Sequence, residues 1–511
     1  MLNRPLEKKK ETEKKQMDIL PKKNNVAEAE TLIKQIFYEK TMKNEEKEIY
    51  KHKITNLKTY KVKISNNYSM LLTNLVNINI IEDSIIEGII FFHYTNSIND
   101  EIIEKFNGKY LCNLNKRNKC NDSSFYCHIC QNNSVTNLIK TKYQNSSLIK
   151  FQFEEIEVCF RLALVENEFY VAINSKEKES FEIAINNLIV KTENKPKHEF
   201  ANIVYELLAY RFNLSMLSLP SEFSERYKML FVLIKLWCKN YSIYGEEYGF
   251  LNDKALIGIV YYLLNKHQNA HYRILLKEFH LLFEKKFMLK FEEKIEIKGK
   301  DRTKIKKFFE INFRNENKNQ SNEWIILYSN LAENNVLKLL NKSTERIIKN
   351  QNNSGLKNLS ELSEGIEKNA SVEVLKQKWL SWLGNEHLFV EKYENLLLII
   401  CSNAKNSLYG PQFCYFVESN FREKLQNELE KLTEIEYIHI RPFKLLNIKE
   451  CPKKLKEENQ KLEENLCTIW IVGIKQREEK LKETFKIILE NFKKNLIKLF
   501  ETTEIKKNWR N

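Results

Sequence analysis

The stretch from Leu230 to Leu251, LFVLIKLWCKNYSIYGEEYGFL, is the most informative part of the sequence. Its first half predicts a helix, because its apolar residues recur at helical spacing and form one stripe: Leu230, Leu233, Leu236 and Trp237. Lys235 and Lys239 lie one turn apart on a neighbouring face, so both ammonium groups point toward the same place. Tyr244 follows just past the predicted helix end, where its ring can stack on a base.

The run Ile234 to Lys239 (IKLWCK), followed by Ile243-Tyr244 and Gly249-Phe250-Leu251, resembles the central-domain signature of eukaryotic nuclear poly(A) polymerases. In that family, lysines and a tyrosine at these places hold the triphosphate and the adenosine of ATP. The resemblance therefore implies nucleotide-binding roles for Lys235, Lys239 and Tyr244. The alternative is that these side chains form an ordinary solvated helix face.

The chain departs from the family directly after this signature. The family has two glycines there, which let the backbone approach the nucleotide, whereas this chain has Asn252 and Asp253. We expect these side chains, one of them anionic, to crowd or repel a triphosphate. The nucleotide site is therefore predicted to be partly degraded.

Composition sets broad limits on the protein. At 511 residues and 42% apolar residues, the chain is long enough for two to four domains with their own cores. The formal charge of +15 favours a polyanionic partner such as RNA, although the general richness in Lys and Asn weakens that inference. No apolar run approaches the roughly 18 residues that cross a bilayer, so we expect an intracellular, soluble protein without membrane contact.

The resemblance implies an α+β fold in three domains. Residues 1–25 form a Lys-rich tail that we expect to be disordered, either simply solvated or a nuclear-import signal. A nucleotidyltransferase-like domain with a mixed sheet is predicted over 26–195, with a leading helix over 27–53 and strands within 71–81, 85–92 and 148–164. A helical central domain follows over 196–350, in which Ser221 is placed to cap the helix that carries Lys235.

The family's metal-binding carboxylates are largely missing from this chain. The family carries a Gly-Ser pair, then Asp-x-Asp on the next strand, then a third Asp on a later strand. The best register puts Thr73-Asn74 at the Gly-Ser pair and Ile85-Ile86-Glu87 at Asp-x-Asp. The strand pattern of Leu148 to Val158 then puts Cys159 at the third Asp. Only Glu87 of the three remains acidic.

The family's two-metal mechanism uses those carboxylates to hold Mg²⁺ ions. Mg²⁺ prefers oxygen ligands, which Ile85 does not offer and the Cys159 thiolate supplies poorly. Glu155 and Glu157 share a predicted strand face with Cys159 but lie one or two pleat repeats away. Glu82 and Asp83 replace the missing ligands only if the register is wrong by two residues. We therefore expect impaired catalysis.

A cysteine-rich segment at 108–135 has no counterpart in the family and is predicted to be an insertion. It contains His128 and four cysteines: Cys112, Cys120, Cys127 and Cys130. Such a set can wrap a structural Zn²⁺, and the alternative is free thiols in a loop.

A polar linker or mobile loop is predicted over 351–375, followed by a C-terminal domain over 376–511. The predicted element order there is β-α-β-β-α, typical of a ferredoxin-like, RRM-like sandwich. Its strands are expected at 396–401, 437–440 and 468–474, and its helices at 413–432 and 479–499. RNA phosphates would contact a set of basic residues, unless these form only a solvated face: Arg441, Lys444, Lys453 and Lys454.

Two functions follow from these observations. The favoured one is a poly(A)-polymerase-like pseudoenzyme of mRNA 3′-end processing that binds RNA, a processing factor or an active paralogue. The alternative is an active polynucleotide adenylyltransferase that adds AMP from ATP to RNA 3′ ends, with Mg²⁺ held by displaced ligands. The family likeness implies a nuclear location in either case.

Overall fold

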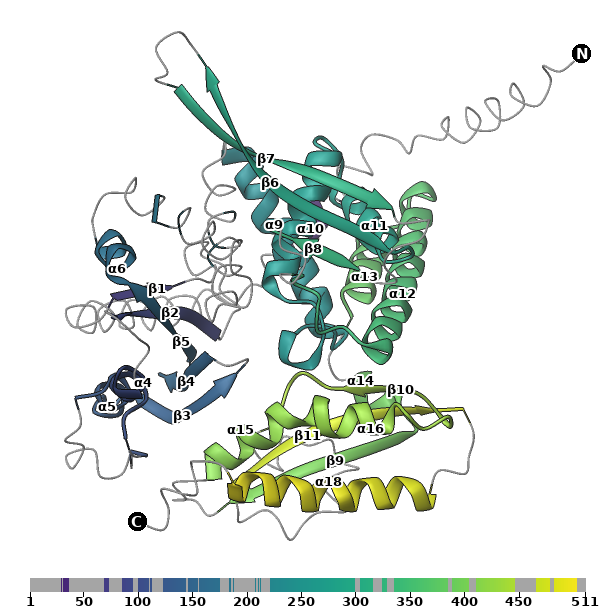
Figure 1. Cartoon of the computed structure of the whole chain (residues 1–511). Helices are drawn as coiled ribbons and strands as arrows, with labels where there is room; N and C mark the ends of the chain where they lie inside the picture. Colours follow the sequence, from purple (N-terminus) through teal and green to yellow (C-terminus); the bar gives the residue numbers. More distant parts are fainter. Residues whose placement is uncertain are drawn as a thin grey trace, which may run out of the picture.

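The computed structural model describes residues 29, 31–35, 69–72, 85–94, 100–109, 111–112, 123–143, 146–154, 156–174, 183–184, 187, 207, 210, 212, 221–298, 304–315, 324–328, 335–384, 388–403, 410–445, 466–477 and 482–502. Helices and mixed sheets occur together in these residues, which confirms the predicted α+β class. Three parts lie next to one another (Figure 1): an N-terminal part (69–174), a middle part (221–384) and a C-terminal part (388–502).

The N-terminal part is built on a five-stranded mixed sheet with the order β1-β2-β5-β4-β3. Its strands are β1 (Ser69–Leu72), β2 (Ile85–Tyr94), β3 (Val135–Tyr143), β4 (Ser146–Phe153) and β5 (Ile156–Glu166). β2 and β5 run parallel, and the other neighbours are antiparallel. The strand predicted at 85–92 is confirmed, while most of the strand predicted at 71–81 lies outside the described residues.

The prediction that Leu148 to Val158 forms one strand was wrong. The chain reverses at Glu154, which has a left-handed φ of 48°, and returns as β5. Glu157 therefore lies on the same strand as Cys159, whereas Glu155 lies outside the described residues.

Three short helices complete the N-terminal part: α4 (Asp100–Asn107), α5 (Phe125–Cys130) and α6 (Asn167–Asn174). Phe125 on α5 stacks on Phe106 at 5.4 Å and meets Phe160 of the sheet edge-on at 5.7 Å. The cysteine-rich segment thus contributes a buried helix to this core, and not only a polar loop.

The middle part is organised around α9 (Ser221–Asn240), as the opening stretch predicts. Every residue from Met229 to Lys235 is buried, so this helix passes through the core and does not show a single apolar stripe. Four more helices form this part with it: α10 (Asp253–Lys266), α11 (Tyr272–Leu282), α12 (Lys342–Glu367) and α13 (Val372–Leu383). Of these, α10 and α13 pack directly on α9.

The linker or mobile loop predicted over 351–375 was wrong, since α12 and the start of α13 occupy these residues. The polar composition misled the prediction because α12 buries polar side chains with partners. Asn352 is 1% exposed, and its Oδ1 accepts from the Nδ1–H of His280 at 2.8 Å, while His280 Nε2 accepts from Trp382 Nε1 at 2.9 Å. Buried polar groups with such partners stabilise a helix that reads as a loop in sequence.

A second sheet in the middle part was missed by the sequence analysis. β6 (Phe287–Lys298) and β7 (Lys304–Asn315) form a long antiparallel hairpin that extends beyond the helices at the top of Figure 1, and β8 (Ile325–Leu327) joins β6 in parallel. The alternation in KIEIK and KIKKFFEINF was the available signal.

Near the N-terminus, residues 29 and 31–35 are helical, and the rest of the helix predicted over 27–53 lies outside the described residues, as does the basic tail. Ala29, Leu32 and Ile33 are buried. The carbonyl of Ala29 accepts a hydrogen bond from Trp379 Nε1 on α13 at 3.2 Å. This segment therefore packs on the middle part.

The C-terminal part has the predicted element order β-α-β-β-α. β9 (Asn395–Asn403) is followed by α15 (Gly410–Asn420), which continues through a π-helical turn (Phe421–Gln426) into α16 (Asn427–Leu429). β10 (Ile435–Ile440), β11 (Leu466–Gln476) and α18 (Lys482–Thr502) complete it, with the sheet order β10-β11-β9.

This sheet is attached to the middle part through β10, which packs on α12, while the short α14 (Leu388–Lys392) packs on β11. Ser343 Oγ on α12 accepts from the Ile438 backbone N–H at 3.1 Å, and His439 Nε2 bonds to the Ser242 carbonyl at 2.7 Å. Trp470 is fully buried, in agreement with a core role. In the described part of the chain, no helix is long and apolar enough to cross a membrane.

Candidate functional site

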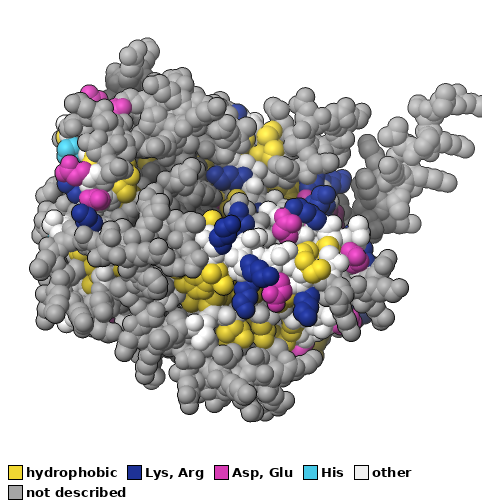
Figure 2. All heavy atoms as spheres, turned by 60° about the horizontal axis from the view of Figure 1, so that its bottom comes forward, with side chains coloured by type: hydrophobic (Ala, Val, Ile, Leu, Met, Phe, Trp, Pro, Cys, Tyr) yellow, Lys and Arg dark blue, Asp and Glu magenta, His cyan; other side chains and the backbone are white. Residues whose placement is uncertain are grey.

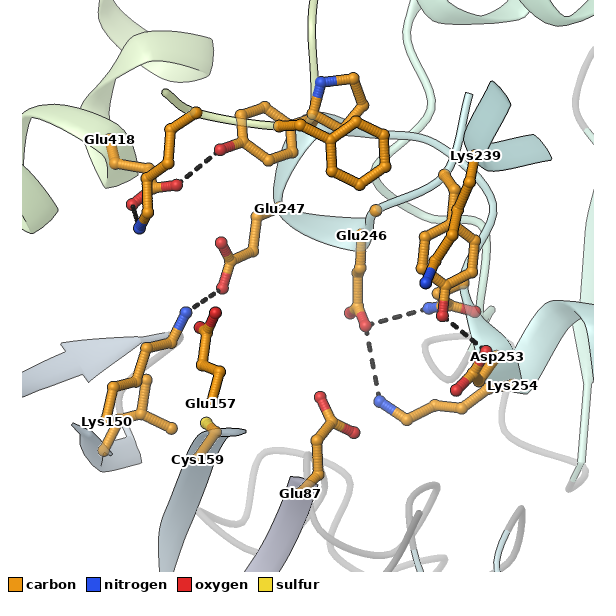
Figure 3. A pocket seen from close by; sticks show the side chains of 18 of the residues that line it. Glu87, Lys150, Glu157, Cys159, Lys239, Glu246, Glu247, Asp253, Lys254 and Glu418 are labelled. Atoms are coloured by element: carbon orange, nitrogen blue, oxygen red, sulfur yellow. Dashed lines mark hydrogen bonds and ion pairs between the residues drawn. The ribbon is translucent and has the colours of Figure 1, made fainter. Parts of the chain in front are cut away.

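A cavity of about 360 Å³ lies where the three parts meet (Figure 3). The N-terminal sheet, the loop between α9 and α10, and the C-terminal part all contribute to its wall. Its charged lining residues are Glu87, Lys150, Glu157, Arg161, Lys239, Glu246, Glu247, Asp253, Lys254, Glu418 and Lys444.

The floor of the cavity is the β2–β5 strand pair. In this parallel register Ile85 lies beside Glu157 and Glu87 lies beside Cys159. Neighbours in register point to the same face of a sheet, so Glu87, Glu157 and Cys159 all face the cavity. The structure therefore brings Cys159 next to Glu87, where the sequence analysis expected the third carboxylate.

The Cys159 thiol is a poor metal ligand in this setting. Cys159 is 5% exposed, and burial raises its pKa to about 12, so the thiol stays protonated at neutral pH. Lys150 on β4 is its register partner on the other side. Burial lowers the pKa of Lys150, but the Glu247 carboxylate more than offsets that effect and the net shift is upward, so an ammonium ion stands beside the thiol.

The described residues do not fit the two Mg²⁺ ions that the resemblance implies. Among them no three His, Cys, Asp or Glu side chains form a group that could hold a metal ion. A neutral thiol and a neighbouring ammonium replace one ligand position, and both features disfavour a divalent cation. Glu82, Asp83 and the Thr73-Asn74 pair lie outside the described residues.

The predicted nucleotide-binding residues converge, but they bind one another. Lys235, with 5% of its side chain exposed, pairs with Asp253 Oδ1 at 2.9 Å. Tyr244 donates to the same oxygen at 2.5 Å, and its ring lies 5.1 Å from Lys235 Nζ and 5.7 Å from Lys239 Nζ. Asp253 thus neutralises the ammonium group that the resemblance assigns to a triphosphate.

Asn252 has a structural role at the start of α10. Its side chain accepts from the Ala255 N–H at 2.9 Å as the N-cap, and its amide donates to Glu246 Oε2 at 2.9 Å. An N-cap amide satisfies a backbone donor that a glycine at this position would leave to water. The Asn252 side chain, which was expected to crowd a nucleotide, therefore caps α10 and binds a carboxylate of the cavity.

Lysines pair with several of the acids that line the cavity (Figure 3). Glu246 lies 3.4 Å from Lys254, Glu247 lies 2.6 Å from Lys150, and Glu418 lies 3.0 Å from Lys444. Burial raises the pKa of Glu246, but Lys254, Arg161 and Asn252 more than offset it, so this carboxyl titrates below its ordinary value. The lining that the described residues form therefore holds close to balanced charge, without a concentrated positive field.

These acids and Lys150 were missed by the sequence analysis. Glu246 and Glu247 were visible inside the opening stretch, between two glycines that adopt positive φ angles of 132° and 74°. Glu418 was visible in the Phe416-Val417-Glu418-Ser419 run. Nothing in sequence spacing shows that these positions face one cavity.

Of the predicted RNA-contacting residues, Lys444 lines the cavity and pairs with Glu418. Arg441 is half-buried after β10, and its backbone N–H donates to the Ile471 carbonyl at 2.9 Å. Lys453 and Lys454 lie outside the described residues. RNA contact by these four residues stays a prediction.

The cysteine cluster is partly assembled. Cys112 Sγ and Cys127 Sγ lie 3.1 Å apart, and Cys130 is buried on the same helix as Cys127. Nδ1 of His128 forms a hydrogen bond to the carbonyl oxygen of Ser124 at 3.1 Å. The described cysteines form no metal-holding group, and Cys120 lies outside the described residues, so structural zinc stays a prediction.

No family model matches the sequence, and the search of curated proteins gives no match either. Among solved structures, the chain is similar to the polymerase core of TRAMP, an RNA surveillance complex, at 13% identity and a TM-score of 0.41, covering 69% of this chain and 91% of that one. It is also similar to the Cid1 poly(U) polymerase bound to MgATP, at 12% identity and a TM-score of 0.39, covering 66% and 97%. A third is CdnC of E. coli MS115-1 in a HORMA complex, at 10% identity and a TM-score of 0.39, covering 69% and 96%. These identities and TM-scores are too low to transfer an activity or a ligand.

Proposed function

We propose that this chain is a poly(A)-polymerase-like pseudoenzyme: a nuclear protein of mRNA 3′-end processing that binds RNA, or a processing partner, without transferring nucleotides. The observation that carries this proposal is the group formed by Cys159, Lys150 and Glu87. A protonated thiol flanked by an ammonium ion occupies the place where the sequence resemblance requires a metal-binding carboxylate.

The nucleotide-binding stretch supports the same conclusion. Lys235 and Tyr244 lie close together, as the resemblance implies for a nucleotide site. Both bind Asp253, however, and its negative charge repels a triphosphate. An active enzyme would have to break this pair before binding ATP. The residues thus maintain the architecture of a nucleotide site without leaving its cation available.

RNA binding is supported by surface charge. The outward face of α18 carries four exposed lysines: Lys486, Lys493, Lys494 and Lys498. Figure 2, in which the bottom of Figure 1 is turned forward, shows Lys and Arg side chains on this side of the molecule, with hydrophobic and a few acidic ones between them. Such a surface favours phosphate contacts without sequence readout.

An incorporation assay tests the proposal. Full-length protein is incubated with ATP, an oligo(A) primer and Mg²⁺ or Mn²⁺, and RNA binding is followed by the fluorescence anisotropy of a labelled oligo(A). We expect RNA binding that weakens with salt and no elongation. Primer elongation by the wild-type chain would establish the alternative, an active adenylyltransferase with displaced ligands. Absence of RNA binding at low salt would refute the RNA-binding half of the proposal.

A further inference from the structure

Four charged side chains from the three parts of the molecule meet at one side of the cavity (Figure 3). Lys150 comes from β4, and Glu247 comes from the 3₁₀ turn Glu246–Tyr248 in the middle part. Glu418 comes from α15, and Lys444 follows β10. Three short contacts connect them: Lys150 to Glu247 at 2.6 Å, Lys444 to Glu418 at 3.0 Å, and the Tyr248 hydroxyl to Glu418 at 2.5 Å.

The C-terminal part also contacts the N-terminal sheet directly at this place. Tyr415 on α15, 4% exposed, packs against Leu148 and Cys159. Lys150 Nζ lies 4.7 Å from the centre of the Tyr415 ring, within cation–π range. One turn away, the Gln412 side-chain amide, oriented for hydrogen bonding, bonds both the N–H and the C=O of Lys140 on β3. α15 therefore packs on the N-terminal sheet, and its Glu418 lines the cavity.

The charges in this cluster depend on one another. Burial lowers the pKa of Lys444, but Glu418 and Glu157 more than offset it, while Lys150 acts against them as a like charge. Burial raises the pKa of Glu418, but Lys444, Lys150 and the Tyr248 hydroxyl more than offset it and hold this carboxyl ionised. Two ammonium groups close enough to repel are thus held together by two carboxylates.

Carboxylate and phosphate oxygens bind ammonium groups in the same way. We propose that Glu247 and Glu418 are internal anions that form a latch between the three parts: Glu247 holds Lys150 of the N-terminal sheet on the middle part, and Glu418 holds Lys444 and binds Tyr248 of the middle part. The phosphate backbone of single-stranded RNA opens this latch by taking over both lysines. The RNA half of this inference rests on the proposed function, whereas the latch does not.

The test variant is Glu247→Gln/Glu418→Gln, which removes both anions and keeps their size. Hydrogen exchange is measured over α15 and the β3–β4 hairpin, and labelled oligo(A) affinity is measured by anisotropy. We expect faster exchange in both segments and about tenfold tighter RNA binding, because RNA no longer competes with the carboxylates. The single variant Glu247→Gln, at a side chain that is 38% exposed, provides the same readout if the double variant folds poorly.

A charge-matched control is Glu364→Gln/Glu428→Gln, which removes two exposed carboxylates on α12 and α16. Its RNA affinity should change less than about threefold, since exposed charges are screened by salt. A third variant, Lys150→Met/Lys444→Met, should also show faster hydrogen exchange, but it should bind RNA more weakly than Glu247→Gln/Glu418→Gln. When the logarithm of its RNA-binding constant is plotted against the logarithm of the salt concentration, the slope should be shallower by about 1.4, or about 0.7 for each lost phosphate contact.

Unchanged hydrogen exchange in both Glu247→Gln/Glu418→Gln and Glu247→Gln would overturn the latch. Faster exchange with unchanged RNA affinity would overturn the role of RNA as the opening ligand. If neither the wild type nor any variant binds RNA while exchange still increases, the RNA-binding half of the proposed function fails and the latch stands.

Discussion

Glu87 on β2 and Cys159 on β5 are direct neighbours across a parallel strand pair, so a carboxylate and a protonated thiol share one edge of the cavity floor. The adjacent register pair is Ile85 and Glu157. The floor therefore alternates acidic and non-acidic positions on both strands. Restoring acids at the other two positions would give four carboxylates in a two-by-two arrangement.

The variant Ile85→Asp/Cys159→Asp should therefore gain a divalent-metal site that the wild type lacks. Oxygen ligands on two adjacent strands suit Mg²⁺ and Mn²⁺, and the metal offsets the repulsion between like charges. Mn²⁺ titration followed by electron paramagnetic resonance should show binding to this variant only, together with a rise in Tm on adding Mn²⁺. The matched control is Ile85→Asn/Cys159→Asn, and equal Mn²⁺ binding by the wild type would contradict the prediction.

Lys235→Met should destabilise the protein by about 2–3 kcal/mol, because it leaves the Asp253 carboxylate without its buried cation. Asp253 keeps 24% of its side chain exposed, which limits the loss. Lys235→Met/Asp253→Asn should recover at least about 1 kcal/mol, since the neutral amide still accepts from Tyr244. Urea unfolding of the four members of the double-mutant cycle measures this, and simple additivity would show that the two side chains do not interact.

Sequence reasoning worked where the information is local. The opening stretch predicted α9 and the place of Tyr244 after its end, and the β-α-β-β-α order of the C-terminal part followed from its alternating and helical patterns. The β2 strand was placed correctly because isoleucines and phenylalanines, which favour strands, dominate its sequence. The division of the chain into domains at 195 and 375 stays a prediction.

Long-range pairing could not be predicted. Lys150 and Glu247 are 97 residues apart, and only the fold shows that they meet. Asp253 was expected to repel a triphosphate, but its pairing with Lys235 depends on how α10 packs on α9. The polar run of α12 read as a linker because its partners, His280 and Trp382, come from other helices.

Gly355→Ala tests the tight packing of α12. A Cβ at this position would lie 2.6 Å from His280 Nε2, and that buried ring is fixed by Asn352 and Trp382. We expect a destabilisation of about 1–3 kcal/mol, although alanine favours a helix by about 1 kcal/mol. The control Gly365→Ala, on the same helix, meets the flexible Lys378 stem at 3.1 Å and should be neutral or stabilising. Urea unfolding compares the two, and a neutral Gly355→Ala would show that α12 does not pack on His280.

Acidification should destabilise the protein through His439 and His280, both fully buried. Burial lowers the pKa of His439 from 6.5 to about 3, with Lys392 adding to the shift, and burial lowers that of His280 from 6.5 to about 4. The Ser242 carbonyl only accepts, so Nε2 of His439 carries the proton and Nδ1 accepts from the Tyr393 hydroxyl at 2.6 Å.

Below pH 6.5 the unfolded chain protonates both histidines while the folded chain keeps them neutral. The unfolded state then binds more protons, so the free energy of unfolding falls as pH falls, by about 1.4 kcal/mol per pH unit for each histidine. The effect is absent above pH 6.5 and extends down to pH 4 for His280 and pH 3 for His439. Glu246 and Glu418 have pKa values below 4.5 in the fold, so they contribute little between pH 7 and 5.

Urea unfolding of the wild type at pH 7, 6 and 5 measures this slope. His439→Gln keeps an amide donor for the Ser242 carbonyl and cannot titrate, so the slope between pH 6 and 5 should fall by about half. Tyr393→Phe removes the donor to Nδ1 and makes room for a proton there, which should raise the pKa of His439 and also flatten the slope. An unchanged slope in both variants would show that protonation of His439 is not coupled to unfolding. The contact that joins β10 to the loop of Tyr244 would then be insensitive to pH.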